Sequence, residues 1–133
     1  MSWDVVVFNL NKRVESVDDI KEDVLMDIGT PTEFKKILQE HFGSVVWEDT
    51  RGKIETPEYA LELSISDDNE TFSNTIFHLY GEKAIYALID LCNENHWQAF
   101  DTGLGQMLDL DHPEKNGYKN FQEYLAFILK NGG

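Results

Sequence analysis

The 133-residue sequence has one cysteine, few basic residues and no long apolar run. The single cysteine, Cys92, excludes an internal disulfide and is typical of proteins from a reducing compartment. No apolar stretch approaches the roughly 20 residues that a membrane-spanning helix needs. The N-terminal apolar run follows no basic residues and is interrupted by Asp4, which does not fit a signal peptide. We therefore expect a cytoplasmic protein that does not bind membranes.

Basic residues are scarce: lysine and arginine total 11 against 25 aspartates and glutamates, a formal net charge of −14. Such a field repels nucleic acid and attracts cationic proteins. The acids concentrate in residues 15–27, 67–70 and 109–114, which we interpret as loops, where binding residues commonly sit. Two interpretations stay open, a surface that serves solubility alone and a field directed at a basic protein partner. The candidate partner-binding residues are Asp18, Asp19, Asp67, Asp68 and Glu70.

The apolar pattern predicts a single α+β domain over residues 1–133. Helical spacing predicts helices over 31–42 and 82–95 and a last one from Asn120, with Phe121, Leu125, Ile128 and Leu129 on one stripe. Strands are predicted over 3–10, 45–48, 52–56, 58–66, 71–80, 97–101 and 106–110, with a turn at 50–52 and a loop over 11–28 that contains one helical turn near 17–20. This order predicts a mainly antiparallel sheet with helices on one face. It is related to the ferredoxin-like βαββ(β)αβ layout, with an added C-terminal helix.

Local signals refine the two internal helices. Thr30-Pro31-Thr32-Glu33 predicts a capping box at a helix start, and Gly43 predicts its end. His41 lies at the edge of that helix's apolar stripe, so we expect a partly buried, hydrogen-bonded histidine rather than a metal ligand. Cys92 falls on the apolar stripe of the second helix, which predicts a core thiol.

The stretch Phe100-Asp101-Thr102-Gly103 resembles the catalytic loop of aspartic proteases. That chemistry needs two carboxylates about 3 Å apart that share a proton, and the chain holds no second Asp-Thr-Gly. A dimeric single-loop protease also has a flap and an apolar-apolar-Gly segment after the loop, where an acidic loop follows here. Gly103 and Gly105 therefore predict a turn between Phe100 and Met107.

Two further motifs lack the context that their chemistry needs. Gly103-Leu104-Gly105 has no lysine and no helix start for a phosphate loop. Asp109-Leu110-Asp111-His112 could offer oxygen ligands, but no glycine hinge or distal glutamate completes a calcium loop. We predict a surface loop there, and we assign no catalytic residue, metal or cofactor.

One group of polar residues is a candidate site. If the predicted hairpin pairs as drawn, Glu62 and His78 lie on one face of adjacent strands, Asn74 shares that face, and Asp101 joins from a neighbouring strand. A Glu–His pair can perform acid–base chemistry, or it can be an ordinary polar tie on an exposed sheet face. We expect Glu62 and His78 to lie within hydrogen-bond reach or to share a water.

Several short segments resemble a group of small bacterial proteins of unknown function. They are Met1-Ser2-Trp3-Asp4 before an apolar strand, Leu61-Glu62-Leu63, Phe77-His78-Leu79 and Trp97-Gln98-Ala99-Phe100-Asp101. The similarity covers most of residues 1–110 in short pieces. The resemblance implies a shared site at Glu62, His78 and Asp101, and it implies no activity.

The leading functional hypothesis is a protein-interaction module for a basic partner. In size and charge the chain looks like immunity proteins, which neutralise toxin domains, many of them basic nucleases. The alternative is a small-ligand-binding protein or enzyme that uses the Glu62, His78 and Asp101 face. A concave, aromatic-lined pocket over these residues favours the ligand, whereas a flat acidic surface favours the protein partner. The oligomeric state is left open.

Overall fold

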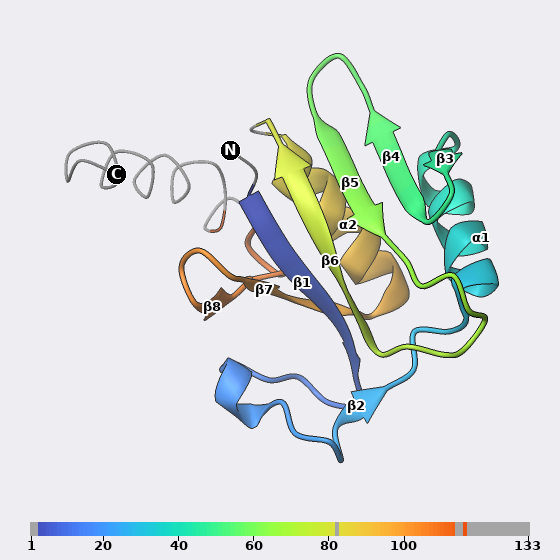
Figure 1. Ribbon diagram of the computed structural model, residues 1–133. Helices are drawn as coiled ribbons and strands as arrows, with labels where there is room; N and C mark the ends of the chain where they lie inside the picture. Colours follow the sequence, from blue (N-terminus) through green and yellow to red (C-terminus); the bar gives the residue numbers. More distant parts are fainter. Residues whose placement is uncertain (1–2, 82, 114–115, 117–133) are drawn as a thin grey trace, which may run out of the picture.

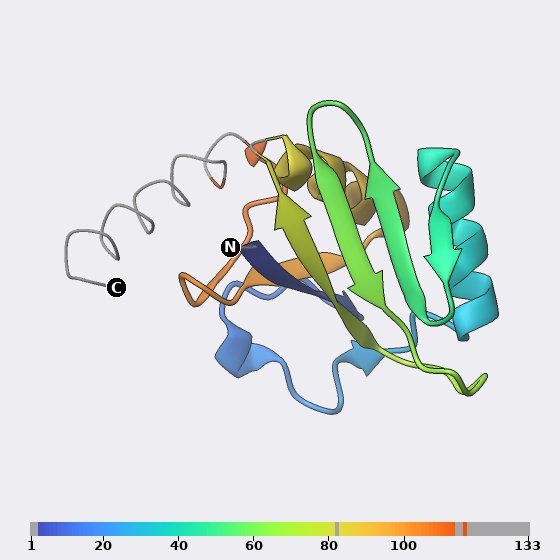
Figure 2. The ribbon, with the colours of Figure 1, turned by 45° about the horizontal axis from the view of Figure 1, so that its top comes forward.

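The computed structural model describes residues 3–81, 83–113 and 116, and in this part of the chain an eight-stranded antiparallel sheet forms the body (Figure 1). Two helices cover one face of the sheet in both views (Figure 1, Figure 2). The elements are β1 (Trp3–Leu10), the 3-10 helix η1 (Val17–Asp19), β2 (Leu25–Met26), α1 (Pro31–Phe42), β3 (Val46–Glu48), β4 (Arg51–Glu55), β5 (Ala60–Ser64), β6 (Asn74–Tyr80), α2 (Ala84–Asn95), β7 (Gln98–Asp101) and β8 (Gln106–Met107).

The strand order is β3-β4-β5-β6-β1-β7-β8, with β2 paired to the end of β1. The first strand is therefore central, as its apolar character on both faces predicts. β6 and β7 both run antiparallel to β1 and flank it, so they point the same way and α2 crosses over β1 between them. Helices that connect strands in this way must lie on a face of the sheet.

The covered face carries the main core. Inward residues alternate along the strands, with Val5 and Val7 of β1 among them. Phe34 of α1 contacts Phe77 of β6 with ring centroids 6.3 Å apart and Trp97 with centroids 6.0 Å apart. The apolar stripes of both helices join this one cluster. The prediction of helices packed on one face of an antiparallel sheet is confirmed.

The capping box predicted for α1 is present. Thr30 Oγ1 accepts from the Glu33 amide at 3.2 Å, and a Glu33 carboxylate oxygen accepts from the Thr30 amide at 3.0 Å. This backbone hydrogen bond lowers the pKa of Glu33. Gly43 then ends the helix with φ 78°, a left-handed conformation that favours glycine.

A second, smaller cluster lies on the other face, where the loop over residues 11–28 folds back on the end of β1. Leu10 packs there against Val14 and Val24. The buried Gln98 side chain accepts from the Val14 amide at 3.0 Å and donates to the Lys12 carbonyl at 2.8 Å. The loop is therefore ordered and contains its predicted helical turn as η1, although β2 within it was not predicted.

The turn predicted at residues 50–52 lies one to two positions too late, because the turn is at residues 49–50. β4 already begins at Arg51, and Asp49, with φ 58°, makes the turn together with Thr50. Gly52 lies opposite Trp47 in the ladder, where an added Cβ would stand 2.7 Å from the Trp47 ring. The glycine therefore makes room for an aromatic side chain instead of bending the chain. The helix predicted from Asn120 lies outside the described residues.

A polar contact joins the two helices. His41 of α1 pairs through Nδ1 with Glu94 of α2 and through Nε2 with Asp90 at 3.4 Å. Its side chain is only 9% exposed, so these carboxylates satisfy both ring nitrogens of a nearly buried group. This confirms the expectation of a hydrogen-bonded histidine at the stripe edge.

Candidate functional site

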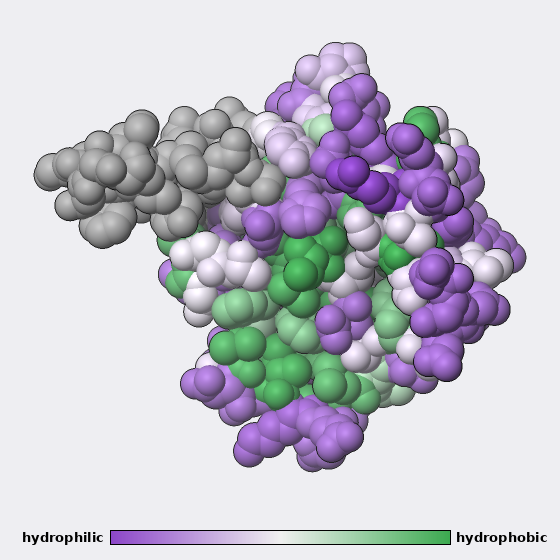
Figure 3. Space-filling model, in the orientation of Figure 1, coloured by the Kyte–Doolittle hydropathy of each residue, from purple (hydrophilic) through white to green (hydrophobic). Residues whose placement is uncertain are grey.

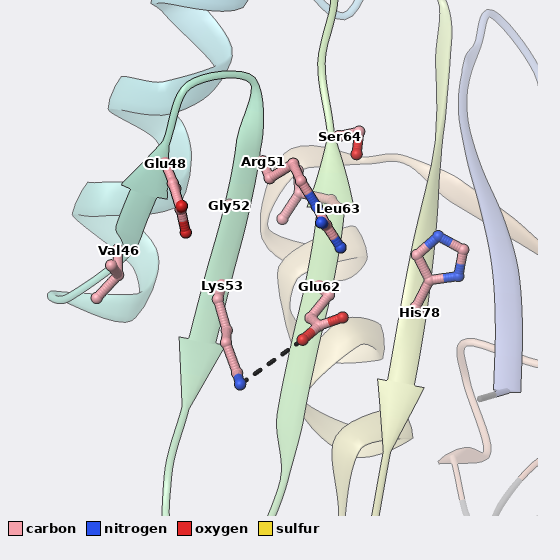
Figure 4. A pocket seen from close by; sticks show the side chains of 9 residues that line it. All are labelled: Val46, Glu48, Arg51, Gly52, Lys53, Glu62, Leu63, Ser64 and His78. Atoms are coloured by element: carbon pink, nitrogen blue, oxygen red, sulfur yellow. Dashed lines mark ion pairs between the residues drawn. The ribbon is translucent and has the colours of Figure 1, made fainter. Parts of the chain in front are cut away.

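The uncovered face of the sheet, here called the open face, carries a row of charged residues across four strands. The register pairs Lys53 of β4 with Glu62 of β5, Glu62 with His78 of β6, and His78 with Asp4 of β1. Directly opposed residues of an antiparallel pair share a face and lie close together. We call these four residues the ionic row, and three of them stand side by side in Figure 4.

Neighbouring side chains of the ionic row pair with one another. His78 Nδ1 lies 2.7 Å from Asp4 Oδ1, and Lys53 Nζ lies 3.6 Å from Glu62 Oε1. Tyr80 also donates its hydroxyl to Glu62 at 3.3 Å. Glu55, and more weakly Glu62, raise the pKa of Lys53 and keep its ammonium charged. Glu62 and His78 are direct neighbours as predicted, but among the described residues their recorded hydrogen bonds go to other partners.

The other predicted members of the polar site are not brought to Glu62 and His78. Asn74 shares the open face at the far end of β6, where its side chain donates to Ser73 at 3.2 Å. Asp101 pairs with Val5 and therefore lies on the covered face. The register of β7 on β1 is the physical reason, because one residue of shift exchanges the faces.

Asp101 is instead a buried anchor of the β7–β8 turn. Its carboxylate accepts from the Trp3 indole nitrogen at 2.9 Å and from the Gly103 and Leu104 amides at 2.9 and 3.2 Å. The residue is 2% exposed. Phe100 pairs with Met107 across the turn, which confirms the hairpin predicted for the Asp-Thr-Gly stretch. The carboxylate therefore supplies hydrogen-bond acceptors to backbone and indole donors that burial removes from water.

A groove of about 300 Å³ lies over the ionic row. Figure 4 shows its lining, which includes Arg51, Lys53 and His78 together with Glu48 and Glu62. Charges of both signs therefore mix within it, and none of its lining residues is aromatic. Ligand pockets of this size are mostly apolar and aromatic, with a few convergent polar groups. The groove lacks phenylalanine, tyrosine and tryptophan, and five charged or titratable side chains line it instead of a few convergent polar groups.

The most concentrated acids lie at one end of the sheet, in the loop around η1 and in the β5–β6 loop (Figure 1, Figure 2). Both loops are anchored there, since the Ile28 amide donates to the Phe72 carbonyl at 2.6 Å and Asn9 donates to the Ser73 carbonyl at 3.1 Å. We call the nine exposed carboxylates of these loops the acidic end: Glu15, Asp18, Asp19, Glu22, Asp23, Asp27, Asp67, Asp68 and Glu70.

Within the part of the chain that the structure describes, no cation forms an ion pair with the carboxylates of the acidic end. Among residues 3–81, 83–113 and 116, none of the nine takes part in an ion pair. Lys12, Arg13 and Lys21 share the first loop, but Arg13 pairs elsewhere, with Asp111 at 3.0 Å. Asp68 accepts from the Glu70 amide at 3.1 Å, and this backbone hydrogen bond lowers the pKa of its carboxyl. The end therefore presents a concentrated negative surface.

The third acidic group does not join this surface. Asp111 is paired with Arg13, and Asp109 pairs with His112 at 3.2 Å while its Oδ1 accepts from the amides of residues 111 and 112. These contacts confirm an ordered surface loop. Glu114 lies outside the described residues.

Three other kinds of site find no support in the described part of the chain. Burial raises the pKa of the Cys92 thiol to about 12, so the thiol is a core group without nucleophilic character. Within these residues no group of three or more histidines, cysteines or carboxylates could hold a metal ion. None of the helices that the structure describes is long and apolar enough to cross a membrane.

Comparison with known proteins adds no assignment. No family model, no curated protein and no solved structure matches this chain. The resemblance to small bacterial proteins of unknown function therefore stays an expectation from sequence.

Proposed function

We propose that this chain is an acidic protein-interaction module that binds a basic protein partner through its acidic end. One observation carries the proposal: nine exposed carboxylates gather at one end of the sheet without an ion pair in the described chain, whereas the residues of the ionic row pair with one another. Uncompensated like charges repel one another, and a cationic partner relieves that repulsion on binding.

The loops suit this role because a rigid sheet holds them. Binding residues are disproportionately found on loops positioned by a scaffold. A field of one sign steers an oppositely charged protein and raises the rate of encounter more than it slows dissociation. The partner we propose is therefore a basic protein, as for immunity proteins of similar size and charge, and the complex forms in the cytoplasm.

We also infer a ferredoxin-like relation for the fold. The elements β1, α1, β5, β6, α2 and β7 follow the βαββαβ order, and β1 lies between β6 and β7 in the sheet. The hairpin β3–β4 is an addition before β5, at the sheet edge. Since this layout hosts many unrelated functions, it supports no particular activity.

The test is affinity capture from native lysate with two matched variants. The loop variant carries Asp67→Asn, Asp68→Asn and Glu70→Gln, which keep hydrogen-bonding oxygens and remove three charges. The control variant carries Glu40→Gln, Glu55→Gln and Glu58→Gln, which remove three charges away from the acidic end, one in α1 and two at the β4–β5 connection. We expect wild type and control to retain a protein with a pI above about 9 at 0.1 M salt, and the loop variant to lose most of it.

Two results contradict the proposal. In the first, the retained protein is itself acidic. In the second, the loop variant retains the same protein as strongly as the control does, at both 0.1 M and 0.5 M salt. Either result leaves the acidic end with solubility as its only role.

A further inference from the structure

The ionic row is complementary to a second copy of itself. Basic and acidic residues alternate along it from strand to strand, in the order Lys53, Glu62, His78 and Asp4. A half-turn about an axis between the two middle residues sets Lys53 opposite Asp4 of a second copy, and Glu62 opposite His78. Displacing this pairing by one strand sets basic against basic and acidic against acidic residues. The alternation therefore specifies one pairing of two copies.

The same axis sets small side chains against large ones. Ser64 of β5 and Ile76 of β6 stand in the row next to the ionic row, and Ala60 and Tyr80 are paired in the row on its other side. The half-turn places Ser64 opposite Ile76 of the second copy, and Ala60 opposite Tyr80. Ile76 is 47% exposed and Tyr80 is 39% exposed. Facing surfaces interdigitate when large residues oppose small ones.

The two halves of the open face also differ in chemistry. On one side of the axis is the groove of about 300 Å³, lined by residues of β3, β4 and β5 together with His78. On the other side the register places Val6 of β1 between Ile76 of β6 and Phe100 of β7, and we call these three residues the apolar row. Figure 3 shows hydrophobic surface gathered over β1 and its neighbours, with hydrophilic surface around it. The half-turn sets the groove of each copy against the apolar row of the other.

The described chain leaves most of this face without a cover. Both helices pack on the other face, and the loop over 11–28 reaches only the end of the open face around Leu10. After β8 the chain runs to the covered face, where Leu108 and Leu110 join the main core and Asn93 of α2 donates to the Leu110 carbonyl at 3.1 Å. Contiguous apolar surface rimmed by polar residues marks a place where another surface packs.

Charge favours a second copy as the occupant. A net charge of −14 keeps two copies apart over much of their surface. The open face is more balanced, because Arg51, Lys53 and His78 lie there beside its carboxylates (Figure 4). The acidic β5–β6 loop leans toward α1, where Thr32 donates to Asn69 at 3.2 Å. The carboxylates of that loop therefore lie toward the covered side, away from the pairing surface.

We propose that this chain forms a symmetric dimer in which two open faces pack together about a twofold axis that runs along the strands, between β5 and β6. Aligned sheets that pack face to face lie about 10 Å apart. The twofold axis makes every contact occur twice, as in other isologous interfaces. The inference stands independently of the proposed basic partner, because the acidic end and the open face share no residue.

Charge reversal tests the pairing of Lys53 with Asp4. One variant carries Lys53→Glu and the other carries Asp4→Lys, so each alone sets like charges opposite one another at two symmetric places. A mixed dimer of the two restores opposite charges at both places. There the introduced glutamate faces the introduced lysine, and the native Asp4 faces the native Lys53. The control is Lys83→Glu, which reverses a lysine that pairs with Glu58 at 3.0 Å outside the open face.

The measurement is sedimentation equilibrium at micromolar concentration. We expect wild type and control to have twice the chain mass of 15.4 kDa. Each reversal alone should weaken the dissociation constant of the dimer at least about tenfold, and the mixture should return it to within about threefold of wild type. Three results overturn the proposal: a monomeric wild type, reversal variants that dimerise as strongly as wild type, and a mixture of the two folded variants that stays monomeric.

A second pair of variants tests the apolar contact and does not depend on the ionic row. Ile76→Lys places a charge in the proposed interface, whereas Tyr86→Lys does so on α2, where Tyr86 is 40% exposed on the opposite side of the sheet. We expect Ile76→Lys to weaken the dimer at least about tenfold and Tyr86→Lys to change it less than about twofold. A dimer that Ile76→Lys leaves intact, or that both variants weaken equally, contradicts packing through the open face.

Discussion

Carboxylates serve two different purposes in the covered face and at the acidic end. On the covered face Asp101 is 2% exposed and holds an indole nitrogen and two backbone amides. At the acidic end nine carboxylates are exposed and unpaired within the described chain. The same functional group is thus structural where burial forces it to find donors, and available for binding where it remains hydrated.

The largest effect on stability is expected for the buried carboxylate of Asp101. Asp101→Ala leaves the Trp3 indole nitrogen and two turn amides without their acceptor in a buried place. We expect a loss of about 2–4 kcal/mol in the free energy of unfolding, measured by urea denaturation. Asp67→Ala, an exposed counterpart, should change this free energy by less than about 0.5 kcal/mol. Similar losses of unfolding free energy for both variants would refute the distinction between structural and exposed carboxylates.

A second effect on the covered face depends on pH. Burial raises the pKa of Cys92 from 9.0 to about 12, so the folded thiol stays protonated while the unfolded chain ionises above pH 9. The contribution of the protonated Cys92 thiol to the free energy of unfolding is therefore complete below pH 9, and it is lost as the pH rises toward 12. Relative to Cys92→Ala, we expect wild type to lose about 2 kcal/mol between pH 8 and pH 10.5.

The measurement is urea denaturation of both proteins across this pH range. Cys92→Ala costs stability through a cavity at every pH, so only the slope with pH carries information. Parallel pH profiles would show that the thiol is not shielded in the folded state.

The ionic row is intermediate between the two regions, because its charges are paired but partly exposed. The side chains of Asp4 and His78 are each 41% exposed, and solvent screens their interaction. In a double-mutant cycle of Asp4→Asn and His78→Gln we expect a coupling free energy of about 0.5 kcal/mol. A coupling above about 2 kcal/mol would contradict a solvent-screened pair and indicate a strongly coupled one.

The smallest expected effect on stability lies at the acidic end. The loop variant should change the free energy of unfolding by less than about 0.5 kcal/mol, with a slight gain at low salt because self-repulsion falls. Thermal denaturation at 0.05 M and 0.5 M salt checks this. A large loss of stability would mean that these carboxylates hold the fold.

More of the fold than of the candidate site could be predicted from the sequence. The capping box at Thr30 and Glu33, the stripes of both internal helices and the alternation of β5 and β6 are local signals, and the structure agrees with them. These signals are informative because apolar side chains that recur with the period of a helix or a strand lie on one buried face.

The placing of Asp101 beside Glu62 and His78 was wrong, and local sequence signals could not have corrected it. Glu62 and His78 are joined by one hairpin, so their shared face follows from alternation. Asp101 enters the sheet after a helix, and its face depends on the register of β7 against β1. The hydrogen-bond donors to Asp101 could not be predicted from the sequence either. One local signal was present, because an Asp before Thr-Gly at a turn commonly accepts from backbone amides.

The central claim is that the acidic end recognises a basic protein, and association kinetics with the captured partner test it most directly. Stopped-flow or surface measurements would compare wild type, the loop variant and the control variant at 0.1 M and 0.5 M salt. We expect the association rate constant of wild type and control to fall about tenfold at 0.5 M salt, and that of the loop variant to be low at both, with dissociation changed less than threefold. Equal association rate constants for the loop and control variants, at both salt concentrations, would contradict the account.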